Sequence, residues 1–224
     1  MTSIQDIIYE LMTSPSTYEE AKRQSEKLDQ MFGFKFDQIE KGLLLKKEEL
    51  EKSVTDQNRQ FWIGLDIQSL QTPYSEIVAM VQKLNPKAGD VWMDLGAGYG
   101  RVGLILGFLC SDVQFYGYEF IAERVNEGNR IRQDWQIKNG ELLQADLIQD
   151  QMDLTKGDVF FIYDFGSRSD VYLVLEKLKS VAAQRPIQVI ARGRGVKNWI
   201  LMDFPWLSQV NSPQHFETWS LFQS

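Results

Sequence analysis

Residues 91–101 read VWMDLGAGYGR: an apolar run, an acid, a glycine-rich turn and the start of a second apolar segment. This order predicts a strand, a loop that cradles a nucleotide, and a helix. Gly96, Gly98 and Gly100 permit positive φ and carry no Cβ, so a ligand can lie on main-chain N–H groups at a helix N-terminus. The stretch predicts a cofactor site without yet naming the cofactor.

The composition limits the classes of function. The chain has 224 residues, 43% of them hydrophobic and 25% charged, as in an ordinary soluble protein with one globular unit and an extension. A net charge of −7 argues against a nucleic-acid partner, because non-specific binding to phosphates needs a positive surface. One histidine, His215, and one cysteine, Cys110, offer little to a metal site or a disulfide, so we expect no metal.

The sequence carries no sign of export or of a membrane span. Its first residues lack a basic segment followed by a continuous apolar one, and no apolar run approaches the roughly 20 residues that cross a bilayer. We therefore expect a cytoplasmic protein with no membrane partner. The oligomeric state is left open by the sequence.

The chain divides near residue 71. Apolar residues recur at helical spacing from Ile4 to Leu11, Ser16 with Glu19 resembles a capping box for a second helix that ends at Gly33, and a third helix follows. We predict a helical N-terminal extension over residues 1–71. Residues 72–224 form the second predicted domain, which contains the glycine-rich loop.

Strands and helices alternate in that second domain. Strands are predicted over residues 91–95, 113–119, 141–145, 159–164 and 187–191, and helices over 74–84, 102–109, 122–135 and 171–183. Two final strands, 207–210 and 216–222, flank a turn over 211–214 and predict an antiparallel hairpin. The predicted fold is α/β, with a doubly wound, mostly parallel seven-stranded sheet and a C-terminal antiparallel hairpin.

Two classes of cofactor compete for the loop. A dinucleotide fingerprint is matched by Gly98, Gly100 and Gly103, with Glu119 as the ribose acid, which favours an NAD-dependent oxidoreductase. That match begins late in the turn and leaves Asp94 unexplained. A pyrophosphate is destabilised by a neighbouring carboxylate, whereas a sulfonium cofactor with a free ammonium group is compatible with one.

The same residues carry a family resemblance. DLGAGYGR, residues 94–101, resembles the first motif of class I S-adenosylmethionine-dependent methyltransferases, which have a Rossmann-like sheet. YGYE, residues 116–119, is similar to the end of their second strand, where Glu119 would accept from the ribose hydroxyls and Phe120 or Ile121 would flank the adenine. QADL, residues 144–147, looks like their third-strand motif, which implies that Asp146 faces the adenine amino group.

The resemblance covers residues 72–224 and implies S-adenosyl-L-methionine as the cofactor. The fourth predicted strand ends in YDFG, residues 163–166, near where the methyl group would lie. The residues expected to bind the cofactor are Thr72, Tyr74, Asp94, Gly96, Ala97, Gly98, Gly100, Glu119, Phe120, Asp146, Leu147 and Asp164. The expected catalytic residues are Asp164, Tyr163 and Tyr74.

The fourth-strand motif also bears on the substrate. YDFG lacks the prolines of the N/D-P-P-Y/F motif typical of enzymes that methylate nucleobase or glutamine nitrogens. The order of motifs is similar to that of seven-strand protein lysine methyltransferases, which implies a protein lysine as the acceptor. A small-molecule methyltransferase, an NAD-dependent oxidoreductase and a non-catalytic cofactor-binding protein are the alternatives.

Several further residues have two readings. Tyr74, Tyr99 and Tyr163 either wall the site or pack in the core. Arg101 either lies on the surface or pairs with Asp94 or Glu119 across the site. A basic cluster follows the fifth predicted strand and consists of Arg192, Arg194 and Lys197. It either anchors an acidic substrate or is a solvated loop. The N-terminal helices are expected to act as a lid or a docking surface.

Overall fold

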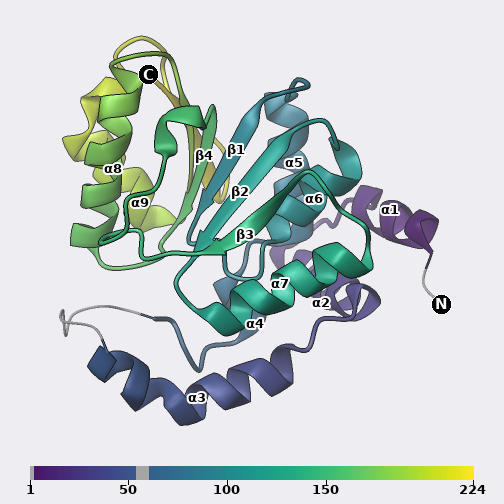
Figure 1. Ribbon diagram of the computed structural model, residues 1–224. Coiled ribbons are helices and arrows are strands. Elements are labelled where there is room, and N and C mark those ends of the chain that lie inside the picture. The colour runs from purple at the N-terminus through teal and green to yellow at the C-terminus, as the bar shows by residue number, and fades with distance from the viewer. Residues whose placement is uncertain (1–2, 54–60) are drawn as a thin grey trace.

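The computed structural model describes residues 3–53 and 61–224. Its strands form one seven-stranded sheet in the order β3-β2-β1-β4-β5-β7-β6 (Figure 1). The first five strands are parallel, and β7 lies antiparallel between β5 and β6. The strand bounds are β1 Val91–Leu95, β2 Gln114–Glu119, β3 Gly140–Gln144, β4 Val159–Tyr163, β5 Gln188–Arg192, β6 Gln214–His215 and β7 Trp219–Gln223.

Helices cover both faces of the sheet. Helices α5 (Tyr74–Leu84), α6 (Arg101–Leu109) and α7 (Ala122–Asp134) lie on one face, and α8 (Arg168–Ala182) and α9 (Arg194–Asp203) lie on the other (Figure 1). Short 3₁₀ helices span η1 (Leu154–Lys156) and η2 (Pro205–Leu207). This is the doubly wound arrangement that the alternation of strands and helices predicts.

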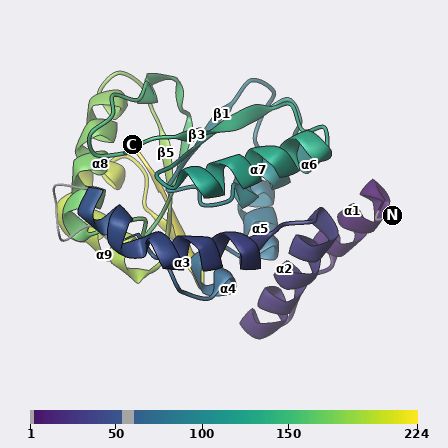
Figure 2. The ribbon, with the colours of Figure 1, turned by 60° about the horizontal axis from the view of Figure 1, so that its bottom comes forward.

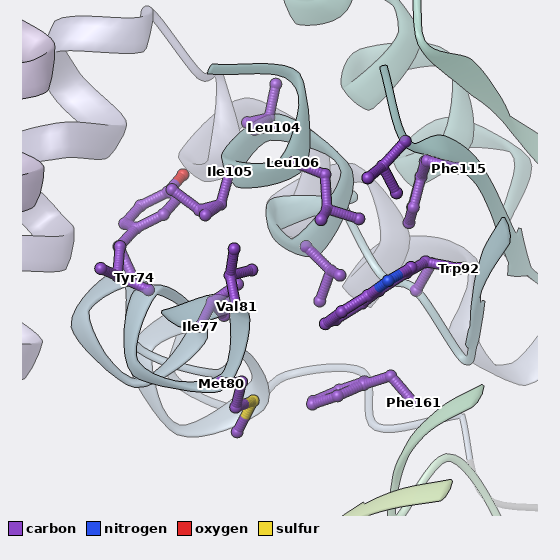
Figure 3. Packing of buried hydrophobic residues seen from close by; sticks show 14 of the residues in the cluster. Tyr74, Ile77, Met80, Val81, Trp92, Leu104, Ile105, Leu106, Phe115 and Phe161 are labelled. Atoms are coloured by element: carbon purple, nitrogen blue, oxygen red, sulfur yellow. The ribbon is translucent and has the colours of Figure 1, made fainter. Parts of the chain in front are cut away.

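The strands contribute side chains to two cores in turn, because successive residues of a strand point to opposite faces. Trp92 of β1 packs with Phe115 and Phe161 against side chains of α5 and α6 (Figure 3). Met93, the next residue, joins the core beneath α8 and α9. Near-continuous apolar strands are therefore buried on both sides, as parallel sheets require.

Three longer N-terminal helices and one short one precede this domain: α1 (Ile4–Met12), α2 (Tyr18–Phe32), α3 (Phe36–Ser53) and α4 (Ile67–Leu70). Helices α1 and α2 pack on α5, and their Leu11 and Phe32 belong to the same core as Trp92. Helix α3 leaves that layer and runs below α7 toward α9 (Figure 2). The division at residue 71 stays a prediction, and residues 1–2 and 54–60 of the extension lie outside the described residues.

The strands and helices lie close to their predicted positions. Each strand predicted between residues 91 and 191 begins and ends within one residue of its observed bounds, and the predicted helix 74–84 is α5. Gly33 ends α2 in the left-handed conformation at φ 84°. The helix cap is displaced by one residue, because Thr17 rather than Ser16 accepts the first-turn N–H, that of Glu20.

The terminal hairpin is antiparallel, as predicted, but its first strand is misplaced. Residues 207–210 form no strand, because Pro205 begins a 3₁₀ turn that buries Leu207 beneath α9. The partner of β7 is the two-residue strand β6, which pairs Gln214 with Leu221 and His215 with Ser220. Within the described ranges 3–53 and 61–224, no helix combines the length and apolarity that a membrane crossing needs.

Candidate active site

The candidate site lies where the loops after β1 and β4 diverge. These neighbouring strands are followed by connections on opposite faces of the sheet, and such a switch point leaves a crevice at the carboxyl ends. A cavity of about 220 Å³ opens there. Its lining comes from the strand ends and from the segment before α5: Phe61, Trp62, Leu65, Ile67, Ser69, Leu70, Gln71, Gly96, Gly98, Tyr99, Glu119, Phe120, Ile121, Arg124, Tyr163, Asp164 and Phe165.

A second hollow of about 60 Å³ adjoins the first. The two share Gly96, Glu119, Phe120 and Phe165, together with Phe61. The second is completed by the loop after β3 and by the start of α8, with Ala145, Asp146, Leu147, Ile148, Gly166 and Asp170. The loops after β1, β2, β3 and β4 therefore surround one continuous region.

The glycines of the loop serve different purposes. All three have positive φ, namely 93° at Gly96, 55° at Gly98 and 79° at Gly100. A Cβ on Gly96 would lie 2.3 Å from Phe165 Cβ, and one on Gly100 would lie 2.7 Å from Leu142 Cδ1, so these two glycines permit protein packing. A Cβ on Gly98 would have only Gln71 Cγ as a neighbour, at 4.0 Å. Gly98 is therefore the glycine that leaves room for a ligand.

The loop does not present a row of free N–H groups, which corrects the sequence-based expectation. The N–H groups of Gly96 and Ala97 donate to the Tyr118 carbonyl, both at 2.9 Å, and that of Gly100 donates to Ala97 at 2.8 Å. The N–H of Gly98 donates to Glu119 Oε2 at 2.9 Å. Three of these N–H groups donate to residues of β2 and the fourth donates within the loop, so the loop is shaped by contacts within the protein.

Glu119, at the end of β2, lies between the loop and the next helix. Its Oε1 accepts from the Ile121 N–H at 3.0 Å, and its Oε2 accepts from Gly98. The carboxylate lines both hollows. Each oxygen has capacity for a second hydrogen bond, so a ligand with two hydroxyls can be held without breaking the existing ones.

Asp94 is the next-to-last residue of β1 and is only 3% exposed. Its Oδ1 has no hydrogen-bond partner among the described residues. Burial, and then the Glu119 carboxylate, raise the pKa of Asp94 well above 3.8. A buried acceptor without a donor is costly, so this carboxylate suits a cationic or donating ligand group.

Asp164 follows β4 and lines the cavity. Its Oδ1 accepts from the Val196 N–H at 3.3 Å. Burial raises the pKa of Asp164, against the opposing effects of that N–H and of Arg192. A Cβ on Gly193 would lie 2.6 Å from Asp164 Oδ2, and one on Gly195 would lie 3.0 Å from Oδ1. The two glycines after β5 therefore make space for this carboxylate.

The other residues expected after β2, β3 and β4 also lie around the cavities. Phe120 packs against Phe61 with ring centroids 5.1 Å apart. Asp146 accepts from the Ile148 N–H at 2.9 Å and lines the second hollow beside Leu147. Tyr163 donates through its hydroxyl to the Ser69 carbonyl at 3.2 Å, which joins the end of β4 to the segment before α5.

Five expected residues line neither cavity, and the buried Asp94 described above is one of them. Tyr74, predicted as a catalytic wall, is fully buried, and its hydroxyl donates to Asp29 at 2.9 Å, so its role is in the core. Thr72 is buried and contributes its carbonyl to Arg101 at 3.1 Å. Ala97 is buried against β2, where a Cβ on Gly117 would lie 2.9 Å from the Ala97 Cβ. Gly100, as noted above, is required for packing.

Arg101 forms neither of its predicted arrangements. It is 2% exposed and makes an ion pair with Asp29 of α2. Gln68 Oε1 accepts from it at 3.0 Å, and its guanidinium lies over the Tyr74 ring at 4.7 Å. Burial raises the pKa of Asp29, while Arg101 lowers it. The first residue of α6 is thereby fixed to the N-terminal helices.

Helix α3 is also joined to the site. Glu40 accepts from Arg124 at 2.9 and 3.1 Å and from the Tyr99 hydroxyl at 2.7 Å. Burial and the Glu40 carboxylate raise the pKa of Tyr99. Both Tyr99 and Arg124 line the cavity, so the extension forms part of its wall.

The basic cluster after β5 is divided between two environments. Arg192 is buried, forms an ion pair with Glu76 at 3.0 Å and lies over the Tyr163 ring at 4.2 Å. Arg194 is exposed and Lys197 is partly exposed.

His215 lies in exposed β6, with Nδ1 2.9 Å from Ser220 Oγ. Among the residues placed by the structure, no three His, Cys, Asp or Glu side chains group as a metal would require.

Sequence reasoning missed residues on the far wall of the cavity. Phe165 stood inside the quoted YDFG motif, but its packing on Gly96 depends on the pairing of β1 with β4. Trp62 and Gln71 precede the second predicted domain and carry no motif. Arg124 had only its place near the start of a helix as a signal.

Comparison with known proteins gives similarity of fold. No protein-family model matches the sequence, and no curated protein is similar to it in sequence. An RNA methyltransferase from Salinibacter ruber in complex with S-adenosyl-L-homocysteine has a TM-score of 0.50 at 18% identity, over 68% of this chain and 91% of that one. A precorrin-6y C5,15-methyltransferase from Geobacter metallireducens has a TM-score of 0.49 at 17% identity, over 71% and 90%.

The order of the strands in the sheet also describes the fold, and it does not depend on sequence identity. Five parallel strands are extended by an antiparallel β7 that lies between β5 and β6. The chain therefore has a Rossmann-like, mostly parallel seven-stranded fold that is similar to the fold of the Salinibacter RNA methyltransferase.

Proposed function

We propose that this protein is an S-adenosylmethionine-dependent methyltransferase that transfers a methyl group to nitrogen, with a protein lysine as the acceptor. One observation carries the cofactor: acidic side chains surround the glycine loop. Glu119 and Asp164 line the cavity, and Asp94, which lines neither hollow, lies buried in β1 two residues before Gly96. Such a site favours a ligand with positive charge.

The cations near the cavity support the same choice. Arg124 is the cationic side chain among the described lining residues, and Glu40 binds it through both carboxylate oxygens. A pyrophosphate would meet acidic groups and loop N–H groups that already donate to the protein. This disfavours the NAD-dependent alternative, whereas a sulfonium with an ammonium group suits the charges.

The residues fit the rest of the cofactor. The carboxylate of Glu119 can accept from two ribose hydroxyls, and the second hollow offers Phe120 and Leu147 to the faces of an adenine, with Asp146 at its edge. Asp94 Oδ1, which has no partner among the residues described, can accept from an ammonium group. When bound, S-adenosylmethionine supplies an electrophilic methyl group on a positively charged sulfur.

The loop after β4 supports an amine as the acceptor. Asp164 lines the cavity. The Val196 N–H donates to its carboxylate, and the absence of a side chain at Gly193 leaves room for it. A carboxylate can orient an amine by accepting one of its N–H groups, and alignment with exclusion of water is most of what this reaction needs. The aromatic rings of Tyr163 and Phe165 line the same cavity and can shield it from solvent.

A nucleic-acid acceptor is the competing class, because the Salinibacter protein of similar fold is an RNA methyltransferase. The net charge of −7 and the acidic cavity disfavour a polyanion.

The test is methyl transfer from labelled cofactor into a cell extract that is then separated into protein, nucleic acid and small molecules. We expect label in protein, recovered as methyllysine after hydrolysis. Asp164→Asn should reduce the label while the exposed control Asp153→Asn leaves it unchanged. Label confined to RNA or to small molecules would refute the lysine assignment, and no transfer to any fraction would count against an enzyme.

A further inference from the structure

Three buried polar atoms around the cavity and the glycine loop have no hydrogen-bond partner among the described residues: the side-chain nitrogen of Gln71, the indole nitrogen of Trp62 and Oδ1 of Asp94. Of the two donors, Gln71 is the one whose side chain lies beside Gly98. Gln71 is 7% exposed and lines the larger cavity. Its Cγ would lie 4.0 Å from a Cβ on Gly98, the glycine that leaves room for a ligand. Buried donors and acceptors are nearly always satisfied, so these atoms require an explanation.

The backbone fixes where Gln71 lies. It ends α4, with its N–H donating to the Ile67 carbonyl at 3.1 Å and its own backbone extended at ψ 149°. Thr72 follows, with its carbonyl bound by the buried Arg101. Backbone hydrogen bonds of Gln71 itself and of the next residue, Thr72, therefore fix the position of Gln71 beside the loop.

The unsatisfied atoms of Gln71 and Asp94 have opposite chemistry. An amide nitrogen donates, and a carboxylate oxygen accepts. An amino-acid group carries the complementary pair, with an anionic carboxylate and a cationic ammonium. Gln71 lies beside Gly98, and Asp94 lies in β1 two residues before the first loop glycine, so one buried donor and one buried acceptor match the two ends of such a zwitterion.

The neighbouring arginines are not available to the carboxylate. Arg124 is bound by Glu40 at 2.9 and 3.1 Å, and Arg101 is paired with Asp29. Within the part of the chain that the structure describes, no other cationic side chain lines the cavity. A ligand carboxylate in this cavity therefore depends on a neutral donor.

We propose that the Gln71 amide donates to the α-carboxylate of the cofactor's amino-acid end while Asp94 accepts from its ammonium group. Gln71 thereby determines specificity for adenosyl ligands that carry an amino acid over those that lack one. This inference rests on the proposed function.

The test compares two ligands by calorimetry. S-adenosylhomocysteine carries the amino-acid end, and 5′-methylthioadenosine has the same nucleoside and sulfur without it. We expect Gln71→Glu, which removes the donor and adds a charge, to weaken S-adenosylhomocysteine at least tenfold and to leave methylthioadenosine within twofold. Gln71→Met, which removes only the donor, should give a smaller loss with the same selectivity. Gln82→Glu, an exposed change on α5, should alter neither affinity.

The outcomes separate the two levels of the proposal. Equal losses for both ligands would assign Gln71 to the structure of the cavity and overturn the inference, as would unchanged binding of S-adenosylhomocysteine. Thermal unfolding of Gln71→Met shows whether a loss reflects misfolding, in which case both affinities fall together. If neither ligand binds the unmodified protein, the proposed function itself fails, and the inference with it.

Discussion

The buried pair between Asp29 and Arg101 should make the two partners unequal in their effect on stability. An arginine cannot lose its charge, whereas a buried carboxyl can take up a proton. Asp29→Asn leaves a guanidinium buried without a counterion, and breaking a buried pair in this way costs about 3–5 kcal/mol. Arg101→Met leaves Asp29 with donors from Gln68 at 2.8 Å and Tyr74 at 2.9 Å, so roughly 1–3 kcal/mol is expected.

The sign of the pH dependence follows from the same contacts. Burial already raises the folded-state pKa of Asp29 above 3.8, and Arg101 opposes that rise. Without the arginine the folded pKa is higher still, so folding takes up a proton between 3.8 and that pKa. The cost of Arg101→Met should therefore shrink as the pH falls from 8 toward 5, and that of Asp29→Asn should change less.

Urea unfolding followed by circular dichroism measures these costs at each pH. For a protein of this size each kcal/mol corresponds to about 2–4 °C in Tm, so Asp29→Asn should lower Tm by roughly 6–20 °C. The free energy of unfolding of the double variant should be close to that of Arg101→Met alone. Glu176→Gln, in an exposed pair with Lys179 at 3.7 Å, serves as the control and should cost under about 0.5 kcal/mol. Additive losses in the double variant, or a larger loss for Arg101→Met, would refute the reasoning.

Three further changes act on the site itself. Asp94→Asn should raise Tm at neutral pH, because the folded-state pKa of Asp94 lies above 3.8 and its ionisation therefore opposes folding. In the unmodified protein we expect the affinity for S-adenosylhomocysteine to increase as the pH rises and Asp94 ionises. Asp94→Asn should remove that increase. Gly98→Ala and Gly33→Ala both place a side chain at positive φ and should each cost about 1 kcal/mol, but only the first should abolish ligand binding by calorimetry. Gly193→Ala displaces the Asp164 carboxylate, so methyl transfer should fall at least tenfold while S-adenosylhomocysteine affinity stays within twofold; equal losses in both would contradict this.

The order of strands and helices could be predicted because local pattern determines it. Apolar runs such as residues 159–163 are strands wherever the sheet is covered on both faces, and glycine at residue 33 ends a helix by its own conformation. The final hairpin could not be placed in the same way. Leu207 is apolar in a strand as in a 3₁₀ turn, and only its burial beneath α9 decides between them.

The site was predictable where its residues lie in one motif after one strand. Glu119 ends β2 and Asp164 directly follows β4, so the parallel sheet brings them to the same edge. The partner of Arg101 lies 72 residues earlier in α2, and no local pattern identifies it. The same is true of Tyr74, whose hydroxyl reaches Asp29 only after α2 packs on α5.

Calorimetric titration of S-adenosylhomocysteine into the protein and into Glu119→Gln tests the central claim most directly. The Glu119 carboxylate is the group that joins the glycine loop to both hollows. We expect one ligand per chain and a loss of about 1–3 kcal/mol in Glu119→Gln, the size of a charge-assisted hydrogen bond, with no change in Glu123→Gln, an exposed pair partner of Lys46. Equal affinity in Glu119→Gln and in the unmodified protein, or no binding to the latter, would contradict the account.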